Sequence, residues 1–129
     1  MGTPEQFLRT KLELATAVNA YPLNAPATAV PPFCIFSRTS TTRERQLDTV
    51  VGTPMGVFSV EIYSDGYSDG KVLADLARVA LNEFAGESDG LTVQNVSLAE
   101  EGDNTPVYLD GHEIPTYVIT QTYTVVWEE

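Results

Sequence analysis

The sequence predicts an α+β domain in which two helices pack on one face of an antiparallel sheet of about four strands. Residues 114–127 alternate as a long strand does, and residues 4–18 and 68–84 have apolar side chains at helical spacing. With shorter strands between them, the expected order is α-β-β-α-β-β with two long loops. The length of 129 residues fits one domain spanning 1–129.

The C-terminal stretch carries the clearest strand signal, because β-branched and aromatic residues favour a pleated, half-buried surface. One face would hold Tyr117, Ile119, Tyr123, Val125 and Trp127, with Gln121 as its polar exception. The other face would hold Val118, Thr120, Thr122, Thr124 and Val126. At ~3.3 Å per residue the stretch spans roughly 45 Å, so we expect the central or longest strand of the sheet here.

Both expected helices have recognisable ends. Thr3 fits the N-cap of the first, and Pro4 suits its first helical position. The second has an apolar stripe that is expected to lie on the sheet, formed by Leu73, Leu76, Ala77, Ala80, Leu81 and Phe84. Gly86 follows as a natural stop signal.

Three shorter stretches, 33–38, 57–63 and 91–98, have the composition of strands. Residues 21–32 contain four prolines, which cannot donate backbone hydrogen bonds. We therefore expect this segment to be an extended connector and not an element of the sheet.

The first long loop, residues 39–56, is long enough to suggest a functional role. Basic residues gather at its start, where Arg38, Arg43 and Arg45 lie within eight positions. Apolar residues follow, namely Leu47, Val50, Val51 and Met55. Two interpretations stay open. The arginines pair locally with Glu44 or Asp48 on a solvated arm, or the arm pairs with carboxylates of a neighbouring subunit.

The second long loop, residues 99–113, is acidic and contains Glu100, Glu101, Asp103, Asp110 and Glu113. Clustered carboxylates can bind a metal ion or act as acid and base. A loop of this kind rarely holds side chains in one arrangement, so a solvated acidic loop is favoured. Its part from Tyr108 through Asp110 to Glu113 is the candidate contact for a basic arm of another subunit.

No nucleotide-binding, zinc-binding or nucleophile motif is present in the sequence. The one cysteine, Cys34, lies in an apolar run typical of a core, and the one histidine, His112, lies in the acidic loop. We therefore expect no catalytic residues, no metal and no cofactor, and a protein that is not an enzyme.

The formal net charge of −11 lacks the basic character of a nucleic-acid-binding surface. Carboxylates repel DNA phosphates, so counterion release cannot drive binding. No run approaches the ~20 apolar residues of a membrane span, and no apolar signal segment appears at the N-terminus, so neither membrane insertion nor export is expected.

Several segments together resemble the tail-completion, or tail-to-head joining, proteins of long-tailed bacteriophages and related gene-transfer particles. They are Y-P-L-N-A-P, then P-P-F-C-I-F-S-R-T-S-T-T-R-E, then V-E-I-Y-S-D-G-Y-S-D-G-K-V-L-A-D-L-A-R-V-A-L, and a last aromatic strand ending near V-V-W. The resemblance covers essentially the whole chain. The chain departs from the usual pattern in a shorter first helix region and a more acidic loop before the last strand.

The resemblance implies a structural virion protein at the head-proximal end of the tail, assembled in the host cytoplasm. Such tail terminators form a ring, commonly hexameric, that caps the tail tube and docks to the head connector protein. DNA passes through the ring without specific binding. The implied partners are therefore further copies of the chain, the tail-tube protein and the head connector protein.

Two other functions remain open at this point. The chain is alternatively a head-completion or tail-tube subunit of the same particle, or a small ligand-binding module with a cleft under the second helix. Location in purified particles separates the first alternative, and a ligand-dependent rise in melting temperature would indicate the second.

Overall fold

The computed structural model describes residues 3–26, 29–43, 54–88, 90–108 and 115–128, and the backbone alone of residues 45–46 and 49–50. The helices are α1 (Pro4–Thr16) and α2 (Tyr67–Leu81). The strands are β1 (Ala20–Pro22), β2 (Phe33–Thr42), β3 (Arg45–Gln46), β4 (Thr49–Val50), β5 (Met55–Ser64), β6 (Gly86–Ser88), β7 (Leu91–Asp103) and β8 (Tyr117–Trp127).

The main sheet has six strands in the order β1-β2-β5-β8-β7-β6, so the prediction of an antiparallel sheet of about four strands in the order α-β-β-α-β-β is wrong. The sheet is mixed, because β1 pairs with β2 in parallel, and the elements of this layer follow as α-β-β-β-α-β-β-β. The two additional strands are three residues long each, too short to show a period in the sequence. One uses the start of the proline-rich connector and the other the segment after α2.

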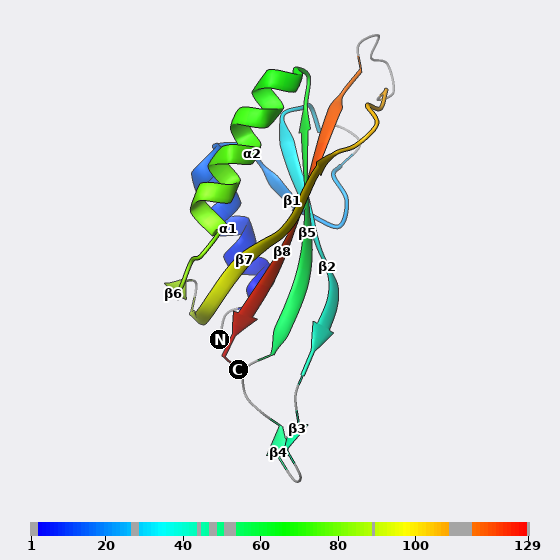
Figure 1. Cartoon of the computed structure of the whole chain (residues 1–129). Coiled ribbons are helices and arrows are strands. Elements are labelled where there is room, and N and C mark those ends of the chain that lie inside the picture. The colour runs from blue at the N-terminus through cyan, green and yellow to red at the C-terminus, as the bar shows by residue number, and fades with distance from the viewer. Residues whose placement is uncertain are drawn as a thin grey trace.

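Both helices cover the same face of a twisted, curled sheet, as Figure 1 shows. Register shifts interrupt the pairing of β2 with β5 and of β7 with β8, and such bulges bend a strand and increase its twist. The Thr3 cap of α1 is confirmed, since its hydroxyl accepts from the Gln6 amide at 3.2 Å. The opposite face of the sheet has no helix over it in the described part of the chain.

The alternation expected for the C-terminal strand is confirmed from Ile119 to Trp127, where every second residue is buried. This strand, β8, lies in the middle of the sheet between β5 and β7. Its buried side chains meet those of β5 and the helices in one core, with Trp127 against Phe58 at a ring distance of 6.4 Å. The segment thus occupies the central position, whereas β7 is the longer strand.

The buried face of α2 differs from the expected stripe. The residues that face the sheet are Gly70, Ala74, Ala77 and Leu81, whereas Leu76 is 43% exposed. Small side chains at these positions let the helix approach closely, and a methyl group on Gly70 would lie 3.2 Å from Ile119. Ala77 and Leu81 belong to both stripes, and the centre of the expected stripe lies about one sixth of a turn away from the true contact.

A polar side chain, Gln121, is fully buried at the centre of this contact. Its Nε2 donates to the Ala74 carbonyl at 2.8 Å and to Glu101 Oε2 at 2.5 Å, and its Oε1 accepts from the Tyr123 hydroxyl at 2.7 Å. Burial raises the pKa of Tyr123, so this hydroxyl remains a hydrogen-bond donor. The network joins α2, β7 and β8 and satisfies polar groups that would be costly to bury alone.

We predict that Gln121→Ala lowers the free energy of unfolding by about 2–4 kcal/mol, because it leaves a cavity and removes the acceptor of the Tyr123 hydroxyl. Urea denaturation measures the loss. Thr122→Ala is the matched control on the neighbouring position, which is half-buried on the other face, and should change stability by less than about 1 kcal/mol. Equal losses for the two variants would contradict the assigned role of Gln121.

Candidate assembly surfaces

The described residues contain no group of three or more His, Cys, Asp or Glu side chains placed to hold a metal ion. Cys34 is buried, and burial raises its pKa to about 12, so it is a thiol at neutral pH. No described helix is long and apolar enough to cross a membrane. The features that stand out are surfaces, namely a projecting arm, one uncovered sheet face and the opposite end of the domain.

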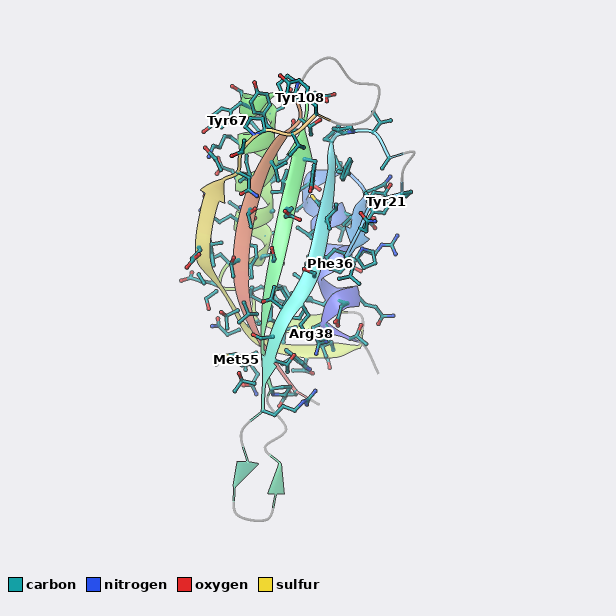
Figure 2. The ribbon with its side chains drawn as sticks, turned by 90° about the vertical axis from the view of Figure 1, so that its right-hand side faces the viewer. Tyr21, Phe36, Arg38, Met55, Tyr67 and Tyr108 are labelled. Atoms are coloured by element: carbon teal, nitrogen blue, oxygen red, sulfur yellow. The ribbon has the colours of Figure 1, made fainter. Side chains whose placement is uncertain are left out.

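Much of the expected loop 39–56 is strand. β2 and β5 extend into it, and β3 pairs with β4 as a separate two-stranded sheet. This arm, formed by β3 and β4, projects beyond the end of the main sheet (Figures 1 and 2). Arg43 at its base is exposed, and Met55 at the start of β5 is 46% exposed. Arg45 and Val50 lie in the arm's two strands, and Leu47 and Val51 lie outside the described residues.

Arg38 is engaged within the domain. Its guanidinium makes two hydrogen bonds to the Glu5 carboxylate, at 2.6 and 3.0 Å, and a third to the Thr41 hydroxyl at 3.1 Å. The same group lies over the rings of Trp127 and Phe58, 5.2 and 5.5 Å from their centres. Arg38 thus ties α1 to the lower half of the sheet and holds the strand that leads into the arm.

Tyr108 lies at the other end of the domain and is 68% exposed. Figure 2 shows it far from Met55, with the length of the sheet between them. Asp110 and Glu113 lie outside the described residues. Within one chain, therefore, the structure does not bring Met55, beside the arm, near Tyr108. A contact between them requires two copies.

The uncovered sheet face is rich in hydroxyl groups. Its middle and lower rows pair Ser37 with Ser59 and Ser59 with Thr122, then Ser40 with Val57 and Val57 with Thr124. Its carboxylates include Glu61 of β5 and Glu100 of β7. Arg38 is the one basic residue in β2, β5, β7 and β8, and it turns to the helix side. The sequence indicated this hydroxyl-rich face by the threonines at alternate positions of β8.

Basic residues gather instead in the helical layer. Arg9 and Lys11 lie on α1, and Lys71 and Arg78 lie on α2. Lys71 donates to Asp103 at 2.6 Å, and Tyr67 donates to the same carboxylate at 2.7 Å. Hydrogen bonds from Lys71 and Tyr67 hold the pKa of Asp103 below its usual range, and this clamp fixes the end of β7 to the start of α2.

Comparison with known proteins identifies related folds and no family. No family model matches the chain, and no curated protein sequence matches it. The chain is similar to a chain of a solved structure described as the virion of a native gene transfer agent particle, with a TM-score of 0.67 and 10% identity over 92% of this chain and 84% of that one. A second solved structure has a TM-score of 0.54 and 17% identity, with 96% of each chain covered. At these identities the likeness shows a shared fold.

We predict that Glu5→Gln and Arg38→Lys each lower the free energy of unfolding by about 1 kcal/mol, because each removes the two-pronged ion pair. The double variant should lose less than the sum of the two. Thermal or urea unfolding of the four proteins measures this coupling. Strictly additive losses would mean that the pair contributes nothing as a unit.

Proposed function

We propose that this chain is a structural virion protein that forms a ring at the head-proximal end of a tail, caps the tail tube and joins it to the head connector protein. The fold shared with a chain of a gene transfer agent virion supports a role in such a particle. The resemblance of its segments to tail-completion proteins supports the position within the particle. Assembly would take place in the host cytoplasm before the protein enters the virion.

The observation that carries the proposal is the separation of charge between the two sides of the sheet. The uncovered face presents hydroxyls and carboxylates, and the described cations of the domain lie in the helical layer or near the arm. A ring with this face inward would present DNA with a wall to which β2, β5, β8 and β7 contribute no lysine or arginine side chain, because Arg38 turns to the helix side. Without phosphate contacts there is no release of counterions to hold the DNA, so it would pass freely.

The arm and the Tyr108 end support assembly through unlike surfaces. They lie at opposite ends of the domain, and a ring closes when one patch of a subunit meets a different patch of the next. The expected acidic loop, residues 99–113, is strand β7 as far as Asp103. A basic arm on this acidic stretch is an electrostatically complementary contact. The interface residues that we propose are Arg43, Arg45, Leu47, Val50, Val51, Met55, Tyr108, Asp110 and Glu113, with Arg38 as the anchor of the strand that bears the arm.

We predict that Arg43→Glu with Arg45→Glu gives a folded protein that fails to assemble, since two attractive contacts become repulsive. Circular dichroism checks folding, and light scattering at increasing protein concentration checks assembly. Arg9→Glu with Arg78→Glu makes the same change of charge on the exposed sides of the helices and should leave assembly intact. Normal assembly of the arm variant would remove the arm from the interface.

The proposed position in the particle is tested by electron microscopy of lysates from a particle-producing strain with a stop codon at Gln6. We expect full heads beside unattached tails, with tails of irregular length. Heads that leak DNA would instead indicate a head-completion protein, and absence of tails would indicate a tail-tube subunit. Intact infectious particles would contradict a virion role of any of these kinds.

A further inference from the structure

Part of the border of the sheet along β7 has no described strand paired with it. The short strand β6 pairs only with residues 91–93, at the lower end in Figure 1. Next along the edge, the Val96 carbonyl accepts from the Glu83 amide at 2.6 Å, and the Leu98 amide donates to Asn82 Oδ1 at 3.0 Å. From Ala99 to Asp103 no described strand lies on the side of β7 away from β8.

The opposite border has a similar free segment on β2. The parallel strand β1 pairs with residues 34–36, and the Leu23 amide donates to the Phe36 carbonyl at 2.8 Å. From Ser37 to Thr42 no described strand lies on the side of β2 away from β5. The free part of β2 lies toward the arm, whereas the free part of β7 lies toward the Tyr108 end (Figure 2).

We propose that the free edge of β7 in one copy, residues 99–103, pairs with the free edge of β2 in the next copy, residues 37–42, so that the sheet continues from subunit to subunit. This inference rests on the proposed ring. It places the base of the arm beside the β7 edge of the next copy, near Ala99, and not beside that copy's Tyr108. Exposed strand edges are templates for pairing with another chain. Here the two templates lie on opposite borders of one sheet, as a head-to-tail ring requires.

The strand directions agree with this pairing. Neighbouring strands are antiparallel throughout β2-β5-β8-β7, so β2 and β7 run in opposite directions. A second copy related by rotation about an axis along the sheet places its β2 antiparallel to β7 of the first. The alternation of directions then continues across the contact without interruption.

The offset between the free segments also suits a closed sheet. Within one copy, the pairings from β2 through β5 and β8 to β7 place Ser37 on the same row as Glu100. To pair residues 37–42 with residues 99–103 of a neighbour, one copy must therefore be shifted along the strands by about four residues, or ~14 Å. Four strands at ~4.8 Å make each subunit ~19 Å wide. The resulting tilt is roughly 35°, within the usual range for strands in closed sheets.

The direction of this shift between neighbouring copies determines which face of the sheet lines the inside of the ring. Seen from the uncovered face, β7 lies on the left and β2 on the right (Figure 2). When the sheet is viewed from the helix side, β2 of the next copy therefore lies to the right of β7. The part of this β2 nearer the arm pairs with the part of β7 nearer the Tyr108 end. In a closed sheet with the usual strand twist, the strands rise to the right when the sheet is viewed from outside. The shift described above has this direction only if the helices lie on the outside of the ring.

The charges of the two edges favour unlike pairing. Residues 99–103 include Glu100, Glu101 and Asp103 and no base, whereas residues 37–43 include Arg38 and Arg43 and no acid. Arg38 and Asp103 form ion pairs inside the domain. Glu100 and Arg43 are both exposed, and we expect their opposite charges to attract each other across the contact. Two β7 edges would repel each other, which opposes a two-fold dimer through this strand.

Cross-linking of cysteine pairs tests the contact. Thr42→Cys and Ala99→Cys, both at exposed strand positions, are placed in one chain and treated with a short bis-maleimide. We expect a ladder of covalent oligomers up to the size of the ring. A mixture of the two single variants should give only a dimer, and neither single variant should cross-link alone. Cys34 is buried in every variant and stays in place.

The matched control pairs Thr42→Cys with Val72→Cys, which is 58% exposed on the outer side of α2, and should give no ladder. A ring-sized oligomer without a ladder from the 42/99 pair would overturn the edge contact and leave the proposed function standing. A ladder of equal yield from the control would overturn it as well. A chain that stays monomeric in solution and is absent from purified particles would overturn both.

Hydrogen exchange on the unmodified protein gives a second measurement that needs no substitution. Assembly should slow the exchange of amides in residues 37–42 and 99–103, since strand pairing protects backbone N–H groups. Unchanged exchange in both segments on ring formation would contradict the pairing.

Discussion

The structure depends on one constraint, the burial of only one face of the central strand β8. Its odd-numbered side chains from Ile119 to Trp127 enter the core under α2, where they join buried apolar side chains of β2, β5 and β7. Because both helices are used on that side, the other face is left to hydroxyl groups and a few carboxylates. The edges of β2 and β7 are only partly paired, because the described strands beside them, β1 and β6, are three residues long.

The periodicity and composition of the sequence were sufficient to predict the long, regular helices and strands. The alternation of residues 117–127 and the helical spacing of residues 68–84 each predicted an element that exists. They could not predict β1 or β6, because a three-residue strand forms only when its partner is already in place. The buried side of α2 was predicted only in part. Ala77 and Leu81 were expected there, whereas Gly70 and Ala74 were missed because small residues carry little hydrophobic signal.

The candidate surfaces were predictable only as stretches of sequence. The arginines of residues 38–45 indicated an arm, but nothing in their spacing showed that Arg38 would turn inward to Glu5 while Arg43 stays exposed. That difference arises from alternation along β2 and from the position of α1, both of which are tertiary. Gln121 looked like an exception in an apolar face, and its role became visible only with Ala74, Glu101 and Tyr123 around it.

Taken together, the molecule separates two tasks by face and by edge. The helical layer covers the core and carries the lysines and arginines of α1 and α2. The uncovered face presents hydroxyls and carboxylates, and the borders and the arm offer backbone groups and charge to a further copy. The most direct measurement of this organisation is a cryo-electron microscopy map of the assembled protein, in solution or at the neck of a particle. The map should show a ring whose inner wall is the hydroxyl-rich sheet face, with α1 and α2 outside. A ring with the helices facing the lumen, or an assembly without a central passage, would contradict it.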